Sequence, residues 1–149
     1  NGLAAPGGTS LQQGVLDKGM PRLDARRAGF GGQVPHRTLT QLLQVSAVHV
    51  YLTYPFVLSW SLLEAMSMGC LVVASDTAPV REVIADGVNG LLTDFFDAPM
   101  LAERIAHALD QHHALTGLRN QARATVVQKY DLATVCLPHT VAWTLGDHY

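Results

Sequence analysis

The chain has little that would mark it as a secreted, membrane-spanning or nucleic-acid-binding protein. Its 149 residues include only two cysteines, Cys70 and Cys136, and neither belongs to a Cys-x-x-Cys pair. No apolar run approaches the length of a membrane span, and residues 1–10 lack the basic and apolar regions of a signal peptide. The net charge of −2 provides no basic field for nucleic acid. We therefore expect a cytoplasmic protein with reduced thiols and no nucleic-acid partner.

The sequence also lacks the spacing of a metal site and the motifs of several enzyme classes. Its seven histidines are scattered, and the adjacent His112 and His113 cannot share one face of the helix predicted there. Neither a Walker-type loop, nor a Gly-x-Ser-x-Gly elbow, nor a kinase signature is present. Cys70 begins a predicted buried strand, which favours a small core residue over a nucleophile. We predict no metal site.

The composition favours one α/β domain. Apolar residues make up 48% of the chain and charged residues only 15%, which suits a parallel sheet covered on both faces or a domain that buries one surface against another. Glycine and proline interrupt residues 1–28, so we predict an irregular N-terminal segment there. The organised domain is predicted to occupy residues 29–149.

Strand and helix patterns alternate along this domain. Strands are predicted at residues 28–34, 47–53, 71–74 and 90–93, and helices at 35–44, 59–68, 79–85, 97–113, 114–129 and 132–144. The alternation indicates a doubly wound, three-layer, Rossmann-like parallel sheet with C-terminal helices. Such sheets bind ligands beyond the carboxyl ends of their strands. The loops at 32–34, 53–59 and 75–79 are therefore the predicted ligand-binding region.

Glu64 is the main candidate for ligand binding. It is the one carboxylate in a helix whose neighbouring residues, Leu62, Leu63, Ala65 and Met66, are expected to be buried. A buried carboxylate without a partner is costly. Its side chain should lean toward the helix N-terminus, where a ligand above the strand ends would lie. The alternative, a solvent-exposed helix glutamate, is disfavoured by these apolar neighbours.

The residues that open this helix have two interpretations. Ser59 and Ser61 can cap the first turn, and the free backbone N–H groups there can attract a phosphate. Ordinary capping without a ligand explains the same residues. Trp60 can stack on a base or sugar, or it can be a core or domain-interface residue.

The segment after the strand at 71–74 is also ambiguous. Asp76 and Thr77 either contact a ligand or cap the next helix. Arg81 and Glu82 form an exposed ion pair, or Glu82 lies near the ligand. Residues 86–90 contain two glycines and are predicted to form a structural turn.

Four blocks occur in a fixed order, namely Gly-Gln-Val-Pro at 32–35 and the segments 48–53, 63–75 and 82–92. Together they resemble the C-terminal, donor-binding domain of retaining GT-B-fold glycosyltransferases of the group-one, family-four type. The resemblance extends over residues 30–143. It implies a nucleotide-diphosphate sugar as substrate and no cofactor. It also implies hexosyl transfer to a glycan or lipid-linked acceptor, as in polysaccharide biosynthesis.

The resemblance assigns roles to particular residues. That family has a Glu-x7-Glu pair, whose second member corresponds to Glu64 and is expected to bind the ribose hydroxyls. The first member falls at Phe56, so no catalytic residue is assigned. The remaining donor-binding residues are the backbone near the base (Gly32, Gln33, Val34), the amides facing the diphosphate or sugar (Ser59, Trp60, Ser61, Leu62) and, as a secondary candidate, Glu82.

The chain also departs from that family in extent. The family's N-terminal acceptor domain and the Arg and Lys that bind the diphosphate have no counterpart, since Arg22, Arg26 and Arg27 are not at matching positions. We therefore expect the isolated chain to be nearly inactive. Its expected partners are the acceptor domain and, for the full enzyme, a peripheral membrane surface. The alternative is a truncated, non-catalytic remnant that self-associates. A flavodoxin-like or receiver-type domain is disfavoured, because neither acidic clusters nor a flavin loop is present.

Overall fold

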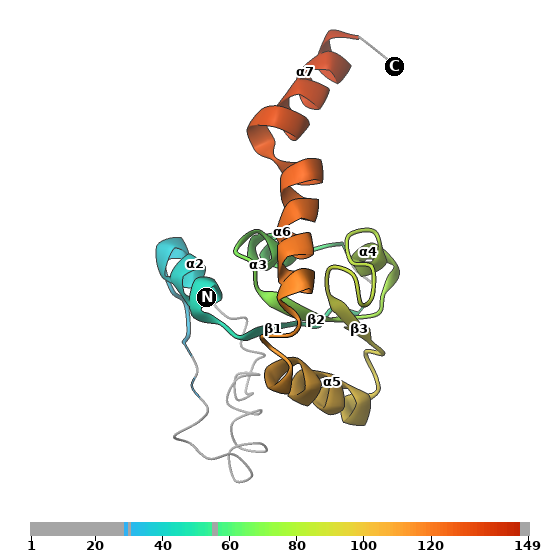
Figure 1. Cartoon of the computed structure of the whole chain (residues 1–149). Helices are drawn as coiled ribbons and strands as arrows, with labels where there is room; N and C mark the ends of the chain where they lie inside the picture. Colours follow the sequence, from blue (N-terminus) through green and yellow to red (C-terminus); the bar gives the residue numbers. More distant parts are fainter. Residues whose placement is uncertain (1–28, 30, 55–56, 147–149) are drawn as a thin grey trace, which may run out of the picture. The chain divides into compact units, whose positions relative to one another are not determined.

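The computed structural model describes residues 29, 31–54 and 57–146 (Figure 1). The chain divides between Val34 and Pro35 into two compact units, and each is described by itself. In the first unit, residues 29 and 31–34 form no strand. The prediction of a strand at 28–34 is therefore wrong for the described residues. Gly32 has a φ of +59°, a left-handed conformation that interrupts an extended chain.

The second unit contains a sheet of three parallel strands (Figure 1). They are β1 (Val48–Tyr51), β2 (Leu71–Ser75) and β3 (Leu91–Thr93), in the order β1-β2-β3. All three correspond to predicted strands. Their parallel pairing confirms the predicted α/β fold, because the connections between them contain helices.

Helices alternate with the strands in the predicted order. They are α2 (His36–Val45), α3 (Trp60–Ser67), α4 (Ala78–Arg81), α5 (Ala98–Asp110), α6 (Thr116–Tyr130) and α7 (Leu137–Leu145). A π-helical turn, η2 (Leu132–Cys136), precedes α7. The predicted helix at 132–144 is therefore divided in two. Pro138, in the first turn of α7, cannot donate a backbone hydrogen bond to the preceding turn.

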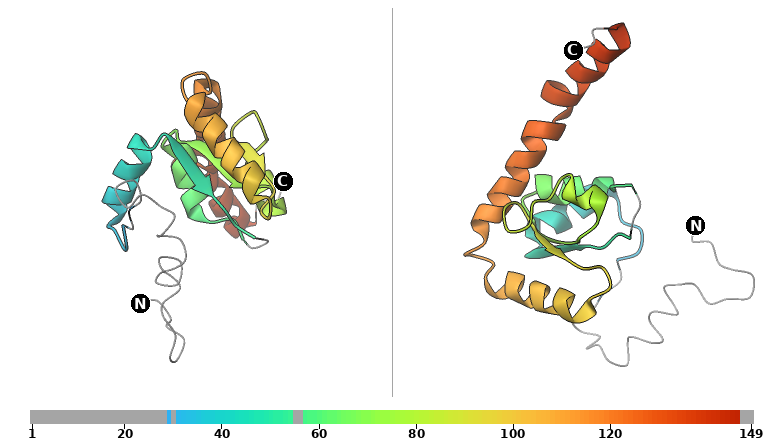
Figure 2. Two further views of the ribbon diagram at one scale, coloured as in Figure 1. Left: turned by 90° about the horizontal axis from the view of Figure 1, so that it is seen from below. Right: turned by 90° about the vertical axis from the view of Figure 1, so that its right-hand side faces the viewer.

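Helices cover both faces of the sheet, which gives three layers (Figure 2). On one face, Val72 and Ala74 of β2 belong to a core cluster formed with α3, α4 and α6. On the other face, Leu71 and Val73 pack against α5. Because alternate residues of a strand point to opposite faces, a strand covered on both sides is apolar throughout. All five residues of β2 are buried.

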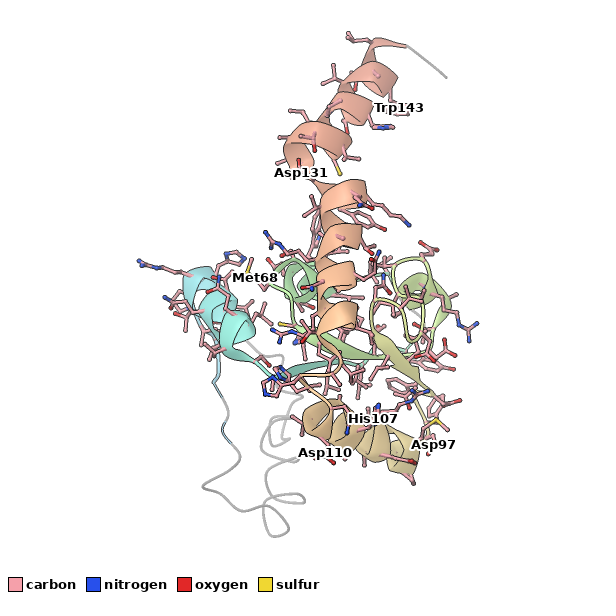
Figure 3. All side chains as sticks on the ribbon, in the orientation of Figure 1. Met68, Asp97, His107, Asp110, Asp131 and Trp143 are labelled. Carbon is pink, nitrogen blue, oxygen red and sulfur yellow. The ribbon has the colours of Figure 1, made fainter. Side chains whose placement is uncertain are left out.

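Acidic side chains fix the starts of two C-terminal elements (Figure 3). Asp97 Oδ1 accepts a hydrogen bond from Met100 N at 2.9 Å at the start of α5. Asp131 Oδ1 accepts hydrogen bonds from Thr134 Oγ1 and Thr134 N, both at 2.8 Å, and these two bonds lower the pKa of Asp131. Both residues cap the elements that follow them.

Beyond α6 the chain exposes large apolar side chains, namely Leu132, Leu137, Val141, Trp143 and Leu145. In Figures 1 and 2, α7 lies away from the sheet. The prediction of C-terminal helices is confirmed, but they add no buried residue to the core from η2 or α7. None of the described helices is both long and apolar enough to cross a membrane.

Candidate functional site

Helix α3 begins where the chain returns from the carboxyl end of β1. Ser59 Oγ accepts a hydrogen bond from Ser61 N at 3.3 Å and caps the helix. Ser59 N donates to the Tyr51 hydroxyl at 3.0 Å, and Leu62 N donates to Ser59 O at 3.1 Å. These bonds join the helix start to β1. They also use the backbone N–H groups of Ser59, Ser61 and Leu62 within the fold.

The two sides of α3 have different surroundings. Leu62, Ala65 and Met66 are fully buried against the sheet, as predicted. Leu63 was expected to be buried too, but it is only partly buried. Glu64 lies at the edge of the buried face, and its side chain is 33% exposed. It is therefore fixed on a rigid helix and remains accessible to a ligand.

The Glu64 carboxylate has a specific partner that sequence patterns did not identify. His36 Nε2 donates a hydrogen bond to Glu64 Oε1 at 2.7 Å, across 28 residues of sequence. His36 is the first residue of α2, and its side chain is 70% exposed. Nothing in the local sequence marks His36 apart from the other histidines, because the contact depends on how α2 packs beside α3.

A cavity of about 460 Å³ adjoins the side of α3 that carries Glu64. Pockets for small ligands have volumes of about 300–1,000 Å³ and mostly apolar walls with a few polar groups. The lining residues come from α3 and its preceding loop (Leu58, Trp60, Leu63, Glu64, Ser67) and from α6 and η2 (Val126, Tyr130, Cys136). Among these described lining residues, Glu64 is the only carboxylate.

Trp60 lies at the rim of this cavity and is 82% exposed. The interpretation of Trp60 as a core residue is therefore wrong. Trp60 and Glu64 are four residues apart on α3, so their side chains share one face of the helix. This face presents an aromatic ring one turn before a carboxylate.

The segment after β2 differs from what we predicted. Arg81 donates to both carboxylate oxygens of Asp76, with Nη2 2.8 Å from Oδ2. The side-chain hydrogen bond from Arg81 lowers the pKa of Asp76. The predicted Arg81–Glu82 pair is wrong, because Asp76 is the partner of Arg81. Thr77 occupies the N-cap position of α4 without a capping side-chain bond, so the capping alternative is wrong for Thr77. Glu82 is exposed at the end of α4.

Two other predictions about non-ligand residues are confirmed. Cys70 is buried, and its Sγ donates to Leu43 O at 2.9 Å. Burial raises the pKa of the Cys70 thiol, against the opposing charge of Arg119. In the turn at 86–90, Asp86 Oδ1 accepts a hydrogen bond from Leu92 N at 2.8 Å. Both features stabilise the fold.

The remaining predicted residues lie in the other compact unit or outside the described residues. Gly32, Gln33 and Val34 belong to the first compact unit. Their predicted role near the base therefore stays a prediction. Phe56 lies outside the described residues. Among the described residues, no three His, Cys, Asp or Glu side chains form a group that could hold a metal ion.

The profile of the family described as "Glycosyl transferases group 1" matches residues 25–125. The chain belongs to this family. It is therefore a member of a family of enzymes that transfer glycosyl groups. No curated protein matches the sequence significantly.

Solved structures of glycosyltransferases have the same fold. Anabaena HepE (Alr3699) in complex with UDP is 25% identical with a TM-score of 0.74, over 93% of this chain and 36% of that protein. Its complex with UDP-glucose gives 24% identity and a TM-score of 0.75, with the same coverage of 93% and 36%. Sucrose-phosphate synthase (tll1590) from Thermosynechococcus elongatus is 21% identical with a TM-score of 0.78, over 97% of this chain and 37% of that protein. The chain thus spans little more than a third of the length of these proteins, and its fold is that of a GT-B Rossmann-like domain with C-terminal helices.

Proposed function

We propose that this chain is the donor-binding part of a retaining glycosyltransferase and binds a uridine-diphosphate sugar through Glu64. The carrying observation is the position of Glu64, which is one-third exposed on a rigid helix at the edge of the cavity. An ionised carboxylate accepts several hydrogen bonds, which matches the two adjacent hydroxyls of a ribose. The family membership and the UDP-bound structure of HepE support this choice of ligand.

Trp60 supplies a second contact in this proposal. Its exposed ring lies on the same face of α3 as Glu64. Aromatic rings stack on bases and on the apolar faces of sugars. A ligand held by Glu64 would lie within reach of this ring. An interface with a second domain is the alternative role for Trp60.

The rest of the donor would extend from these two contacts. We propose the backbone at Gly32, Gln33 and Val34 for the base, and Glu82 as a secondary contact. The amides at the start of α3 remain candidates for the diphosphate. Since three of them already donate within the fold, a phosphate there would have to share or displace those bonds.

The proposed complete reaction is hexosyl transfer to a glycan or lipid-linked acceptor bound by a separate N-terminal domain. Polysaccharide biosynthesis and a peripheral membrane association belong to the same proposal. The chain alone should catalyse little transfer, because Phe56 cannot replace the first acid of the family's Glu-x7-Glu pair. Stabilising charge as it develops on a leaving diphosphate also needs cations or oriented amides.

Calorimetric titration of the 149-residue chain with UDP, ADP and GDP tests the proposal. We expect UDP to bind, and we expect Glu64→Gln to weaken binding by about tenfold or more, the usual cost of losing hydrogen bonds to a charged group. Glu103→Gln, an exposed position on α5, is the matched control and should bind as the wild type does. A folded chain that binds none of the three nucleotides would contradict the proposal.

The second candidate function is a non-catalytic module that self-associates, and the exposed apolar side chains of η2 and α7 favour it. Patches of this kind often mark interaction surfaces. Phe56→Glu separates the two functions. A donor site should gain affinity for UDP-glucose relative to UDP, whereas a remnant should gain none. Light scattering at increasing protein concentration should show a monomer under the donor-binding proposal. A self-associating remnant should instead gain apparent mass as its concentration rises.

A further inference from the structure

We propose that His36 is a positioning residue for the donor-binding carboxylate, holding Glu64 in the orientation in which it accepts the ribose hydroxyls. This inference rests on the proposed function of Glu64. Its basis is the 2.7 Å hydrogen bond from His36 Nε2 to Glu64 Oε1. His36 acts through Glu64 and need not touch the ligand itself.

The contact is fixed by the packing of two helices. Near the other end of α2, Gln44 Nε2 lies 3.7 Å from Met68 Sδ, and Cys70 Sγ donates to Leu43 O at 2.9 Å. Helix α2 is therefore held near its C-terminal end by these two contacts and at its first residue by the bond from His36 to Glu64. A histidine at the first position of α2 consequently lies within hydrogen-bonding distance of Glu64, in the middle of α3.

The chemistry suits a positioning role. A glutamate side chain on a helix surface samples several rotamers, and a ligand that orders it must offset that lost freedom. A hydrogen bond to one oxygen restricts the side chain before the ligand arrives. A carboxylate has about four lone-pair sites, so one bond from His36 leaves acceptors for both ribose hydroxyls. The imidazole can donate this bond as the neutral tautomer that carries its proton on Nε2, and also as the charged ring.

The position of His36 also argues against a purely structural role. Its side chain is 70% exposed, so the ring adds little buried apolar surface to the fold. An exposed pair of this kind contributes little to stability on its own. A change at His36 should therefore alter ribose recognition far more than it alters unfolding.

The test compares UDP with 2′-deoxy-UDP as calorimetric probes of the 149-residue chain. We expect the wild type to prefer UDP, and His36→Ala to reduce that preference by about three- to tenfold, the usual range for one hydrogen bond. His36→Gln should restore most of it, because its side-chain amide can donate to the same oxygen. His107→Ala, an exposed histidine on α5, is the control and should leave the preference unchanged.

A double-mutant cycle separates positioning from an independent contact. If His36 acts through Glu64, His36→Ala should cause no further loss in the Glu64→Gln background. An additive loss, or a His36→Ala variant that keeps the wild-type preference, would overturn the positioning role while leaving the donor site standing. A wild type that does not prefer UDP, or that binds it independently of Glu64, would overturn the proposed function and this inference with it.

Discussion

Asn89 offers the sharpest test of which parts of this chain serve stability and not ligand binding. It is only 5% exposed and lies in the turn that was predicted to be structural. Its Oδ1 accepts a hydrogen bond from Ala85 N at 2.8 Å, and its Nδ2 donates to Val83 O at 2.9 Å and to Thr125 Oγ1 at 3.1 Å. One side chain thus joins the segment after α4 to helix α6.

The expected cost of Asn89→Ala follows from these three bonds. Thr125 keeps its own bond to Gln121 O at 2.8 Å, but the main-chain groups of Ala85 and Val83 lose a partner. Each of these two orphaned groups costs about 1–3 kcal/mol, so we expect the free energy of unfolding to fall by about 2–6 kcal/mol. Such a loss is a large share of the roughly 5–15 kcal/mol that stabilises a typical domain.

Urea denaturation followed by circular dichroism measures this loss. The midpoint should fall and the slope should stay constant, since the surface exposed on unfolding is nearly the same. Val88→Ala, in the same turn but 54% exposed, is the control and should change stability by no more than about 0.5 kcal/mol. If Asn89→Ala changed stability as little as the control, the structural assignment would be refuted. UDP affinity, measured where the variant is folded, should be unchanged.

Two further predictions concern buried titratable groups. Because burial raises the pKa of the Cys70 thiol, only Cys136 should react rapidly with a thiol reagent in the native chain, and equal fast reaction of both would contradict the assignment. Burial lowers the pKa of His49 below 6.5, so the unfolded chain binds the proton more readily and stability should fall as the pH decreases below about 6.5. His49→Phe should show a smaller fall in urea midpoint between pH 7.5 and pH 5 than the wild type does. An equal fall in midpoint for the two proteins would disprove this role of His49.

The order of strands and helices after residue 35 could be predicted because each signal is local. The apolar run at 71–74 predicts a strand buried on both sides, and Asp97 and Asp131 cap the elements that follow them. The strand expected at 28–34 is absent from residues 29 and 31–34. There, apolar residues between glycines suggested an extended chain, whereas the left-handed conformation of Gly32 interrupts it.

The side-chain pairs could not be predicted in the same way. Arg81 lies next to Glu82 in sequence, yet it bonds to Asp76, because the short helix α4 turns its side chain back toward the end of β2. His36 reaches Glu64 across 28 residues. Both pairs depend on the direction in which one element leaves another. A pattern of residue types along the chain does not contain that information.

Helix α3 shows why Glu64 could be singled out from the sequence although its hydrogen-bond partner could not. A fully buried carboxylate would have carried a large desolvation cost and would have been inaccessible to a ligand. The structure instead buries Leu62, Ala65 and Met66 and leaves Glu64 at the boundary, 33% exposed and hydrogen-bonded to His36. The buried residues fix the helix to the sheet, and the boundary residue gains a fixed position at a moderate cost. An apolar helix with one carboxylate at its edge therefore indicates how the helix packs, and the same boundary is where we propose that a polar ligand binds.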